Sequence, residues 1–241
     1  MISLKKVKYS YSGRLAVEDV SIHFASDERA AVMGANGSGK STLALLIKGL
    51  LTPDEGNILI DGLPTGEINP GKIGFVFQNP ENQLVGATVE REIAFGLENA
   101  GMERRKMIKR VDEILEQFGL ERYRKHPPHK LSGGQKQMLA LAAVMVLQPQ
   151  WLILDEPSSL LDSAAKSDFL HLIFNIHPKT GIIFITQDAL EASVFPRLII
   201  MNQGRIFYDG GFDSFFKEHD ALNQAGIEPP VRFALEQRLA V

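Results

Sequence analysis

Residues 30–41 read AAVMGANGSGKS, and this stretch decides the fold. Its first four residues form an apolar run that predicts a buried strand, and residues 40–50 have the apolar spacing of a helix. Between them, residues 34–41 match the pattern G-x-x-x-x-G-K-[ST] in full. Glycines let backbone N–H groups turn inward, and the following helix N-terminus favours an anion. The stretch therefore predicts a loop that cradles the phosphates of a nucleotide.

The residues expected to contact the nucleotide lie in this loop and directly after it. Lys40 is predicted to reach the β- and γ-phosphates, and the Ser41 hydroxyl is predicted to ligate Mg²⁺. The other expected contacts come from Asn36, Gly37, Ser38, Gly39 and Thr42. The alternative is a glycine-rich turn with a chance lysine, but the flanking strand and helix supply the context that the motif requires.

Composition limits the class of protein. The chain has 241 residues, of which 44% are hydrophobic and 23% are charged, which fits one large α/β domain with a small appendage. A net charge of -3 does not point to nucleic acid, and the lack of cysteine excludes disulfides and thiolate metal sites. The longest apolar stretch, residues 138–147, is too short for a bilayer span and predicts a buried helix. The N-terminus lacks the pattern of a signal peptide.

Strand and helix patterns alternate along most of the chain. The expected strands cover residues 2–9, 20–24, 30–33, 58–60, 73–77, 151–154, 182–186 and 198–201. The expected helices cover residues 40–50, 88–100, 103–118, 133–147, 163–176 and 189–194. This alternation predicts an α/β fold with a largely parallel sheet covered on both faces. Residues 85–148 interrupt it and are expected to form an inserted helical subdomain, and short helical pieces are expected after Tyr208.

Residues 151–157, WLILDEP, predict a buried strand that ends in two adjacent acids. Acids at the carboxyl end of a parallel strand face the crevice where ligands bind, and side chains alternate in direction along a strand. Asp155 is therefore suited to the Mg²⁺ shell, and Glu156 to polarising an attacking water. The alternative is an ordinary acidic turn after a strand, which the phosphate loop makes less attractive.

Residues 131–135, LSGGQ, open the long apolar helix and predict a second anion-binding helix N-terminus. Its members are Ser132, Gly133, Gly134 and Gln135. One phosphate site does not need two such termini, so a chain with both can offer one to its own nucleotide and one to a partner's. The alternative is a capped helix start with glycine turns.

The phosphate loop, LSGGQ and then LILDEP at residues 152–157 together resemble the ATP-binding cassette (ABC) family over residues 1–208. The resemblance implies a P-loop NTPase core of ABC type with antiparallel β elements near the N-terminus. It implies an ATPase domain over residues 1–218 and a C-terminal dimerisation element over residues 219–241. It also implies ATP and Mg²⁺ as ligands, with two ATPase chains facing each other head to tail around the nucleotides.

The resemblance assigns roles to three more residues. Tyr11 is similar to the aromatic residue that stacks on adenine, although a tyrosine that packs on its own sheet is the alternative. Gln78 is similar to the glutamine that senses the γ-phosphate and Mg²⁺, and its alternative is a polar strand end. Asp162 is similar to the acid of the loop that crosses the dimer interface. It would also cap the following helix, and both roles can hold at once.

One position departs from the family pattern. The family usually has a histidine between the threonine and the aspartate after residues 182–185, but this chain has Thr186, Gln187 and Asp188. A glutamine can form hydrogen bonds but cannot carry positive charge or relay a proton. We therefore expect Gln187 to slow hydrolysis at this chain's own phosphate loop. This expectation favours a heterodimer with a paralogue over an engineered change.

Residues 78–99 resemble one branch of the family, the ATPases of energy-coupling factor importers for vitamins and transition-metal ions. The NPENQ segment at residues 79–83 is expected to dock a transmembrane coupling subunit through exposed amides and acids; a solvated connector is the alternative. A substrate-binding membrane subunit completes the expected complex, which places this chain peripherally on the cytoplasmic face of the membrane. Residues 222–241, amphipathic over 231–239, resemble the branch's dimerisation element, with packing on their own domain as the alternative.

Three rival functions remain open at this stage. A soluble ABC ATPase of DNA repair, iron–sulfur assembly or translation would have tandem cassettes or long insertions, which this chain lacks. An ordinary P-loop kinase or GTPase would give LSGGQ no role. A non-catalytic regulatory module is consistent with Gln187, but the intact Glu156 argues against it.

Overall fold

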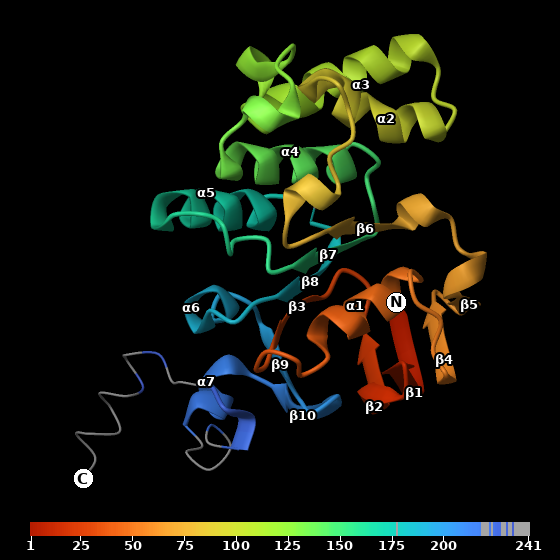
Figure 1. Cartoon of the computed structure of the whole chain (residues 1–241), viewed down its shortest axis with the longest axis vertical. Helices are drawn as coiled ribbons and strands as arrows, with labels where there is room; N and C mark the ends of the chain where they lie inside the picture. Colours follow the sequence, from red (N-terminus) through yellow and green to blue (C-terminus); the bar gives the residue numbers. More distant parts are fainter. Residues whose placement is uncertain (177, 218–221, 223, 228–229, 231–232, 234–241) are drawn as a thin grey trace. The chain divides into compact units, whose positions relative to one another are not determined.

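The computed structural model describes residues 1–176, 178–217, 222, 224–227, 230 and 233. The chain divides into two compact units (Figure 1). Unit 1 contains residues 1–69 and the described residues from 181 onward, and unit 2 contains residues 70–180. Each unit contains part of the apolar core and part of the residues singled out by the sequence.

Unit 1 contains an antiparallel four-stranded sheet built largely from the N-terminal third of the chain. Its strands are β1 (Ile2–Tyr11), β2 (Arg14–Phe24), β4 (Glu55–Ile60) and β5 (Leu63–Pro64), in the order β2-β1-β4-β5. Leu4 lies opposite Ile22 on one side and Ile58 on the other, so one apolar face is buried. This sheet confirms the antiparallel β elements expected near the N-terminus.

A second group of strands in unit 1 runs in the order β10-β9-β3-β8. The members are β3 (Arg29–Met33), β8 (Gly181–Ile185), β9 (Arg197–Asn202) and β10 (Arg205–Gly210). β3 is parallel to both β8 and β9, whereas β10 pairs with β9 in antiparallel fashion. Unit 1 also contains helices α1 (Lys40–Lys48), α6 (Ala189–Ala192) and α7 (Phe212–Phe216) and the 3-10 turn Thr65–Glu67. β8 is buried along its whole length, as expected for a parallel strand covered on both faces.

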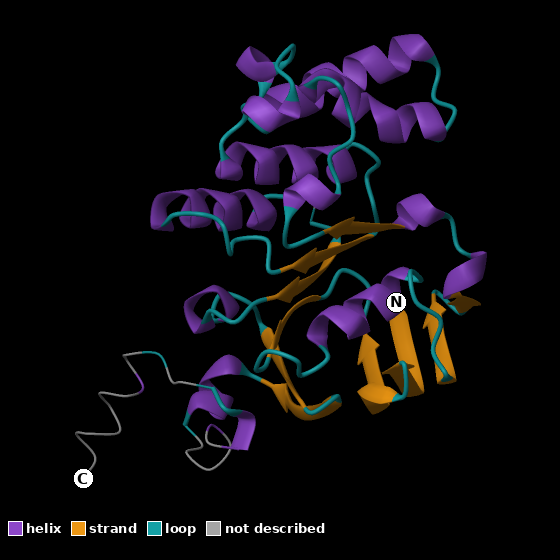
Figure 2. Ribbon diagram, viewed as in Figure 1, coloured by secondary structure: helices purple, strands orange, loops and turns teal. Residues whose placement is uncertain are grey.

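Unit 2 is mainly helical (Figure 2). Its two strands, β6 (Ile73–Val76) and β7 (Trp151–Asp155), are parallel and fully buried. Its helices are α2 (Val89–Asn99), α3 (Arg104–Gln117), α4 (Gly133–Met145) and α5 (Ser163–Phe174), with 3-10 turns at Pro70–Lys72, Pro80–Asn82, Glu121–Tyr123 and Pro128–Lys130. The expected helical subdomain, residues 85–148, lies within this unit.

The structure confirms the α/β class and most of the expected elements, with ends displaced by a few residues. Helix α1 ends at Lys48, before Leu50, because Gly49 adopts the left-handed conformation that closes a helix. Strand β10 was not expected; the signal for it is the tight turn at Gln203–Gly204, which reverses the chain after β9.

Most of the expected C-terminal element lies outside the described residues, including residues 231–239 apart from Phe233. Phe233 itself is buried and stacks on Phe216 of α7 with ring centroids 5.5 Å apart. At this residue the structure favours packing on the chain's own domain.

Candidate functional site

The phosphate loop lies in unit 1 between the end of β3 and the start of α1. Gly34, Gly37 and Gly39 have φ angles of 150°, 78° and 101°, which side chains rarely adopt. A Cβ atom on Gly34 would overlap the Met201 carbonyl oxygen and come within 2.6 Å of Ser38 Oγ. Only glycine can occupy position 34, because the backbone of β9 lies too close for a side chain. This requirement fixes the identity of the residue at the start of the loop.

Two polar side chains of the loop, Lys40 and Ser38, are buried. Lys40 is 5% exposed, and its Nζ donates hydrogen bonds to the carbonyl oxygens of Gly34 at 2.9 Å and Ala35 at 3.0 Å. Ser38 Oγ is buried and has no hydrogen-bond partner among the described residues. A buried hydroxyl without a partner is costly, and a phosphate oxygen is the kind of acceptor that would satisfy it. Asn36 and Ser41 are exposed, and Thr42 is buried at the start of α1.

Strand β8 places Gln187 at the same edge of unit 1 as the phosphate loop. Val32 of β3 pairs with Ile185 of β8, so the carboxyl ends of both strands lie next to each other. Gln187 is exposed, and the segment around it is fixed by Thr186, whose hydroxyl donates to the buried Glu191 at 2.5 Å. The Asp188 N–H in turn donates to the Thr186 hydroxyl at 3.0 Å.

Tyr11 lies at the end of β1 and is 45% exposed. Its ring meets that of Tyr9 edge-on, with centroids 4.9 Å apart. Tyr11 is therefore partly exposed, and its stacking on adenine stays a prediction.

Unit 2 brings the acidic pair and Gln78 together. β6 and β7 are parallel, with Val76 opposite Leu154, so the residues that follow them emerge side by side. Gln78 Nε2 donates a hydrogen bond to Glu156 Oε2 at 3.1 Å, whereas Asp155 is 8% exposed at the end of β7. Glu156 has a φ of 46°, and strained backbone of this kind is concentrated at functional sites.

The LSGGQ segment forms a capped start of helix α4. Gln135 N–H donates to Ser132 Oγ at 3.3 Å, and Ser132 N–H donates to Gln135 Oε1 at 2.9 Å, which completes a capping box. Ser132 and Gly133 are exposed, and a Cβ on Gly134 would contact the Leu161 side chain at 3.5 Å. Asp162 is exposed and caps α5 by accepting a hydrogen bond from Ala165 N–H at 2.8 Å, as its sequence position predicted.

The segment that follows Gln78 is a folded surface tied to helix α4. Asn79 caps the 3-10 turn by accepting from Glu81 N–H at 2.9 Å, and Lys136 of α4 forms an ion pair with Glu81. That contact lowers the pKa of Glu81 because the cation stabilises the carboxylate. Gln83 bridges the main chain of unit 2, accepting from Phe77 N–H at 3.2 Å and donating to the Ala140 carbonyl at 3.4 Å.

Sequence reasoning missed Glu92, which fixes the loop before α2. Glu92 is 5% exposed, and its Oε2 accepts hydrogen bonds from Val85 N–H at 2.8 Å and from Gly86 N–H. The sequence offers one indication of this role: Glu92 is an acidic residue on the apolar face of an amphipathic helix. The buried carboxylate holds Val85, which is 71% exposed, on the surface.

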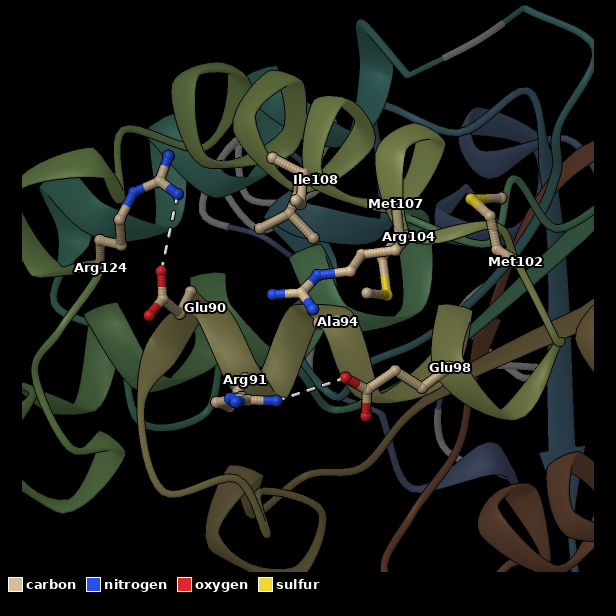
Figure 3. A pocket seen from close by; sticks show the side chains of 10 residues that line it. Glu90, Arg91, Ala94, Glu98, Met102, Arg104, Met107, Ile108 and Arg124 are labelled. Carbon is tan, nitrogen blue, oxygen red and sulfur yellow. Dashed lines mark hydrogen bonds and ion pairs between the residues drawn. The ribbon is translucent and has the colours of Figure 1, made fainter.

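A groove of about 440 Å³ lies between α2 and α3 in unit 2 (Figure 3). Its apolar lining includes Met107, Ile108 and Val111. Charged side chains surround these: Arg124 pairs with Glu90 at 3.6 Å and Arg91 pairs with Glu98 at 3.4 Å. An apolar surface with charges of both signs at its edge is suited to binding a helix that carries both kinds of residue.

Comparison with known proteins agrees with this arrangement. A family model described as ABC transporter matches residues 17–159. This chain belongs to the ABC transporter family. It is 40% identical over 98% of its length to the energy-coupling factor transporter ATP-binding protein EcfA1 of Halalkalibacterium halodurans, covering 88% of that protein. It is 42% identical over 96% of its length to the protein of the same name from Listeria monocytogenes, covering 85% of it.

Two solved structures of ATP-binding cassettes are similar to this ABC ATPase fold. One is cbiO1 from Clostridium perfringens, described as part of the ABC transporter complex cbiONQ; it has a TM-score of 0.83, 31% identity and 98% coverage of both chains. The other is a dimeric ATP-binding cassette in a post-hydrolysis state with ADP and Pi bound, with a TM-score of 0.79 and 28% identity; the match covers 88% of this chain and 99% of that one. The family and the fold class expected from the sequence are confirmed.

Proposed function

We propose that this chain is the ATP-hydrolysing subunit that energises an importer of the energy-coupling factor type. The observation that carries the proposal is that one cassette contains two helix starts of the kind that bind anions. Unit 1 provides a glycine-determined loop with a buried Lys40 and Ser38, and unit 2 provides the self-capped helix start at Ser132. The similarity to EcfA1 proteins over nearly the whole chain selects the energy-coupling factor branch.

In the proposed reaction, the loop amides and Lys40 hold the β- and γ-phosphates of ATP. Glu156 orients a water for in-line attack on the γ-phosphate, and Gln78 holds the Glu156 carboxylate through the 3.1 Å hydrogen bond. Phosphoryl transfer needs positioning and charge stabilisation more than covalent chemistry, and these fixed polar groups supply both. Tyr11 is proposed to stack on adenine.

Ser41, Asp155 and Gln78 are the proposed ligands of Mg²⁺. No group of three or more acidic, histidine or cysteine side chains suited to a metal occurs in the described part of the chain. Mg²⁺ is usually bound by one or two carboxylates together with substrate phosphates and water, and Asp155 would supply one such carboxylate. When bound, Mg²⁺ neutralises charge on the triphosphate.

The second helix terminus implies a second ATPase chain, so that Ser132, Gly133, Gly134 and Gln135 complete the ATP site of a partner. Asp162 is proposed to lie at the same contact between the chains. We infer a paralogous partner because Gln187 replaces the histidine of the family pattern, and a mate with that histidine would restore one fully active site. ATP would favour the closed pair because its γ-phosphate binds both chains.

The proposed membrane partner docks on residues 78–99 and the groove between α2 and α3. None of the described helices combines the length and apolar character that a bilayer span requires. From the similarity to energy-coupling factor ATPases, the chain is proposed to reach the cytoplasmic face of the membrane through a coupling subunit, with a substrate-binding membrane subunit as the third component. A vitamin or a transition-metal ion is the proposed cargo class.

The test is ATP turnover by the complex purified through a tag on this chain. In a complex whose second ATPase chain lacks its own phosphate-loop lysine, Glu156→Gln should lower the remaining rate by at least about 100-fold, because the carboxylate that orients water is lost. The matched control is Glu116→Gln, which makes the same change on the exposed surface of α3 and should leave the rate unchanged. Full turnover by Glu156→Gln would overturn the assignment. Full turnover by Gly134→Asp would instead favour a phosphate-loop enzyme that does not use LSGGQ.

A further inference from the structure

The carboxamide of Gln135 is held by two hydrogen bonds of opposite sense. Its Oε1 accepts from Ser132 N–H at 2.9 Å within the capping box, and its Nε2 donates to the phenol oxygen of Tyr123 at 2.7 Å. The cap at the start of α4 is therefore connected to a residue outside that helix. Tyr123 belongs to no motif that the sequence singles out.

Tyr123 is itself fixed by its neighbours in the connection between α3 and α4. The Arg122 guanidinium lies 4.7 Å from the centroid of its ring, and the His126 ring meets it edge-on at 5.5 Å. The His126 N–H also donates to the Tyr123 carbonyl oxygen at 2.7 Å. The phenol oxygen is thereby presented to Gln135 by a locally ordered turn.

The same turn is bonded to the first residues of helix α2. Val89 N–H donates to the His126 carbonyl at 3.0 Å, and Glu90 N–H donates to the Arg124 carbonyl at 3.1 Å. The Arg124 side chain adds an ion pair to Glu90 at 3.6 Å (Figure 3) and another to Asp112 of α3. The Val89 and Glu90 N–H groups belong to the N-terminal turn of α2, where main-chain N–H groups lack partners inside the helix. A displacement of α2 would therefore move the turn that carries Tyr123.

We propose that Tyr123 is a positioning residue that links the membrane-docking helix α2 to the LSGGQ cap through its hydrogen bond to Gln135. The proposal rests on the proposed function, in which α2 contacts the membrane partner and Ser132 contacts a neighbour's ATP. Movement of α2 would be passed through residues 123–126 to the Gln135 carboxamide and would reorient the Ser132 N–H and hydroxyl. Every contact in this chain of bonds lies inside unit 2.

The first test is spectroscopic and uses the purified chain. Tyr123→Phe removes only the phenol oxygen and keeps the ring in place. The side-chain amide resonance of Gln135 should shift, whereas the melting temperature should stay within about 2 °C of the original value. The matched control is Tyr208→Phe, which also removes a phenol hydrogen bond, to the Gly211 carbonyl at 2.9 Å, but lies in unit 1. It should leave the Gln135 resonance unchanged.

The second test measures ATP turnover by the purified complex. Tyr123→Phe should lower kcat about five-fold, which is the change in rate that corresponds to the free energy of one ordinary hydrogen bond. KM for ATP should stay within about two-fold, because the phosphate loop is untouched. A tyrosine that only fills space would leave kcat unchanged, since phenylalanine retains the ring.

The outcomes separate this proposal from the proposed function. An active wild-type complex in which Tyr123→Phe shifts no Gln135 resonance, or leaves kcat unchanged, would overturn the role of Tyr123 alone. A wild-type complex without ATPase activity would overturn the proposed function, and the inference that rests on it would fail with it.

Discussion

The phosphate loop of unit 1 and the LSGGQ segment of unit 2 are both helix starts built to receive phosphate, but they are held in different ways. At Gly34 and Gly39 the backbone leaves no room for a side chain, and Lys40 bonds to carbonyl oxygens of its own loop. The start of α4 is exposed and is held by side chains, with Gln135 bonded to Tyr123 and the next residue, Lys136, paired with Glu81.

This difference indicates two mechanical roles. Backbone crowding excludes a side chain at Gly34 and Gly39, so we expect the phosphate loop to act as a preorganised receptor for ATP. Side-chain hydrogen bonds can be exchanged at low cost, so the start of α4 can change partners when a second chain or a membrane subunit arrives. The predictions below test whether the two regions respond to substitution as this contrast requires.

The largest effect is expected at Gly34. Gly34→Ala should destabilise the protein by about 3 kcal/mol, because the added Cβ overlaps the Met201 carbonyl and the φ of 150° disfavours a side chain. Urea unfolding would measure the loss. Gly13→Ala is the matched control: its φ is 82°, but apart from its chain neighbours no described residue has an atom within 4 Å of the added Cβ, so it should cost only about 1 kcal/mol. Equal losses at both positions would refute the crowding argument.

A smaller effect is expected from Glu92, which shows how the docking surface is held. Glu92→Ala removes the acceptor of two main-chain N–H groups and should cost about 2 kcal/mol. Hydrogen exchange at Val85 and Gly86 should accelerate about 30-fold if the loop opens locally. Glu98→Ala, on the same helix but in an exposed pair with Arg91, should change stability by less than about 0.5 kcal/mol. Unchanged exchange at Val85 would show that Glu92 does not hold the loop.

The expected effect of Gln187 is on rate and not on folding. In a complex whose second ATPase chain lacks its own phosphate-loop lysine, Gln187→His should raise the remaining turnover by about ten-fold, because imidazole can carry charge and relay a proton where an amide cannot. Leu190→His places the same ring on α6 at a side chain that is 70% exposed, and it should not change the rate. Equal rates for Gln187→His and the original chain would show that position 187 does not limit the chemistry.

The smallest effect concerns the link between Glu81 and Lys136. The hydrogen bond and charge of Lys136 lower the pKa of Glu81. The ion pair between them therefore contributes its full stability above the ordinary pKa of 4.5, and this contribution is lost as the pH falls through the lowered pKa of the folded state. Glu81→Gln should therefore lower the melting temperature at neutral pH, by no more than about 2 °C because the Glu81 side chain is 63% exposed. The difference from the original chain should disappear in acid. A difference that persists in acid would mean that charge does not form this link.

The sequence was sufficient for the fold class, the family and the order of the main elements, because glycine patterns, apolar periodicity and helix caps act over short distances. The capping role of Asp162 could be predicted for the same reason. Glu92 and Tyr123 could not, because their partners are main-chain or side-chain atoms brought near by the packing of helices. Strand β10 was missed although the turn at Gln203–Gly204, which joins it to β9, is a local signal. The roles of the site residues in catalysis stay predictions.

The left-handed backbone of Glu156 has a consequence for selection. A φ of 46° costs a glutamate about 1 kcal/mol, and asparagine tolerates that region better. Glu156→Asn should therefore make the protein more resistant to heat while removing the group that orients water. Screening a mutant library by thermal tolerance alone would enrich inert variants at this position, whereas a screen that also requires ATP consumption would keep the glutamate.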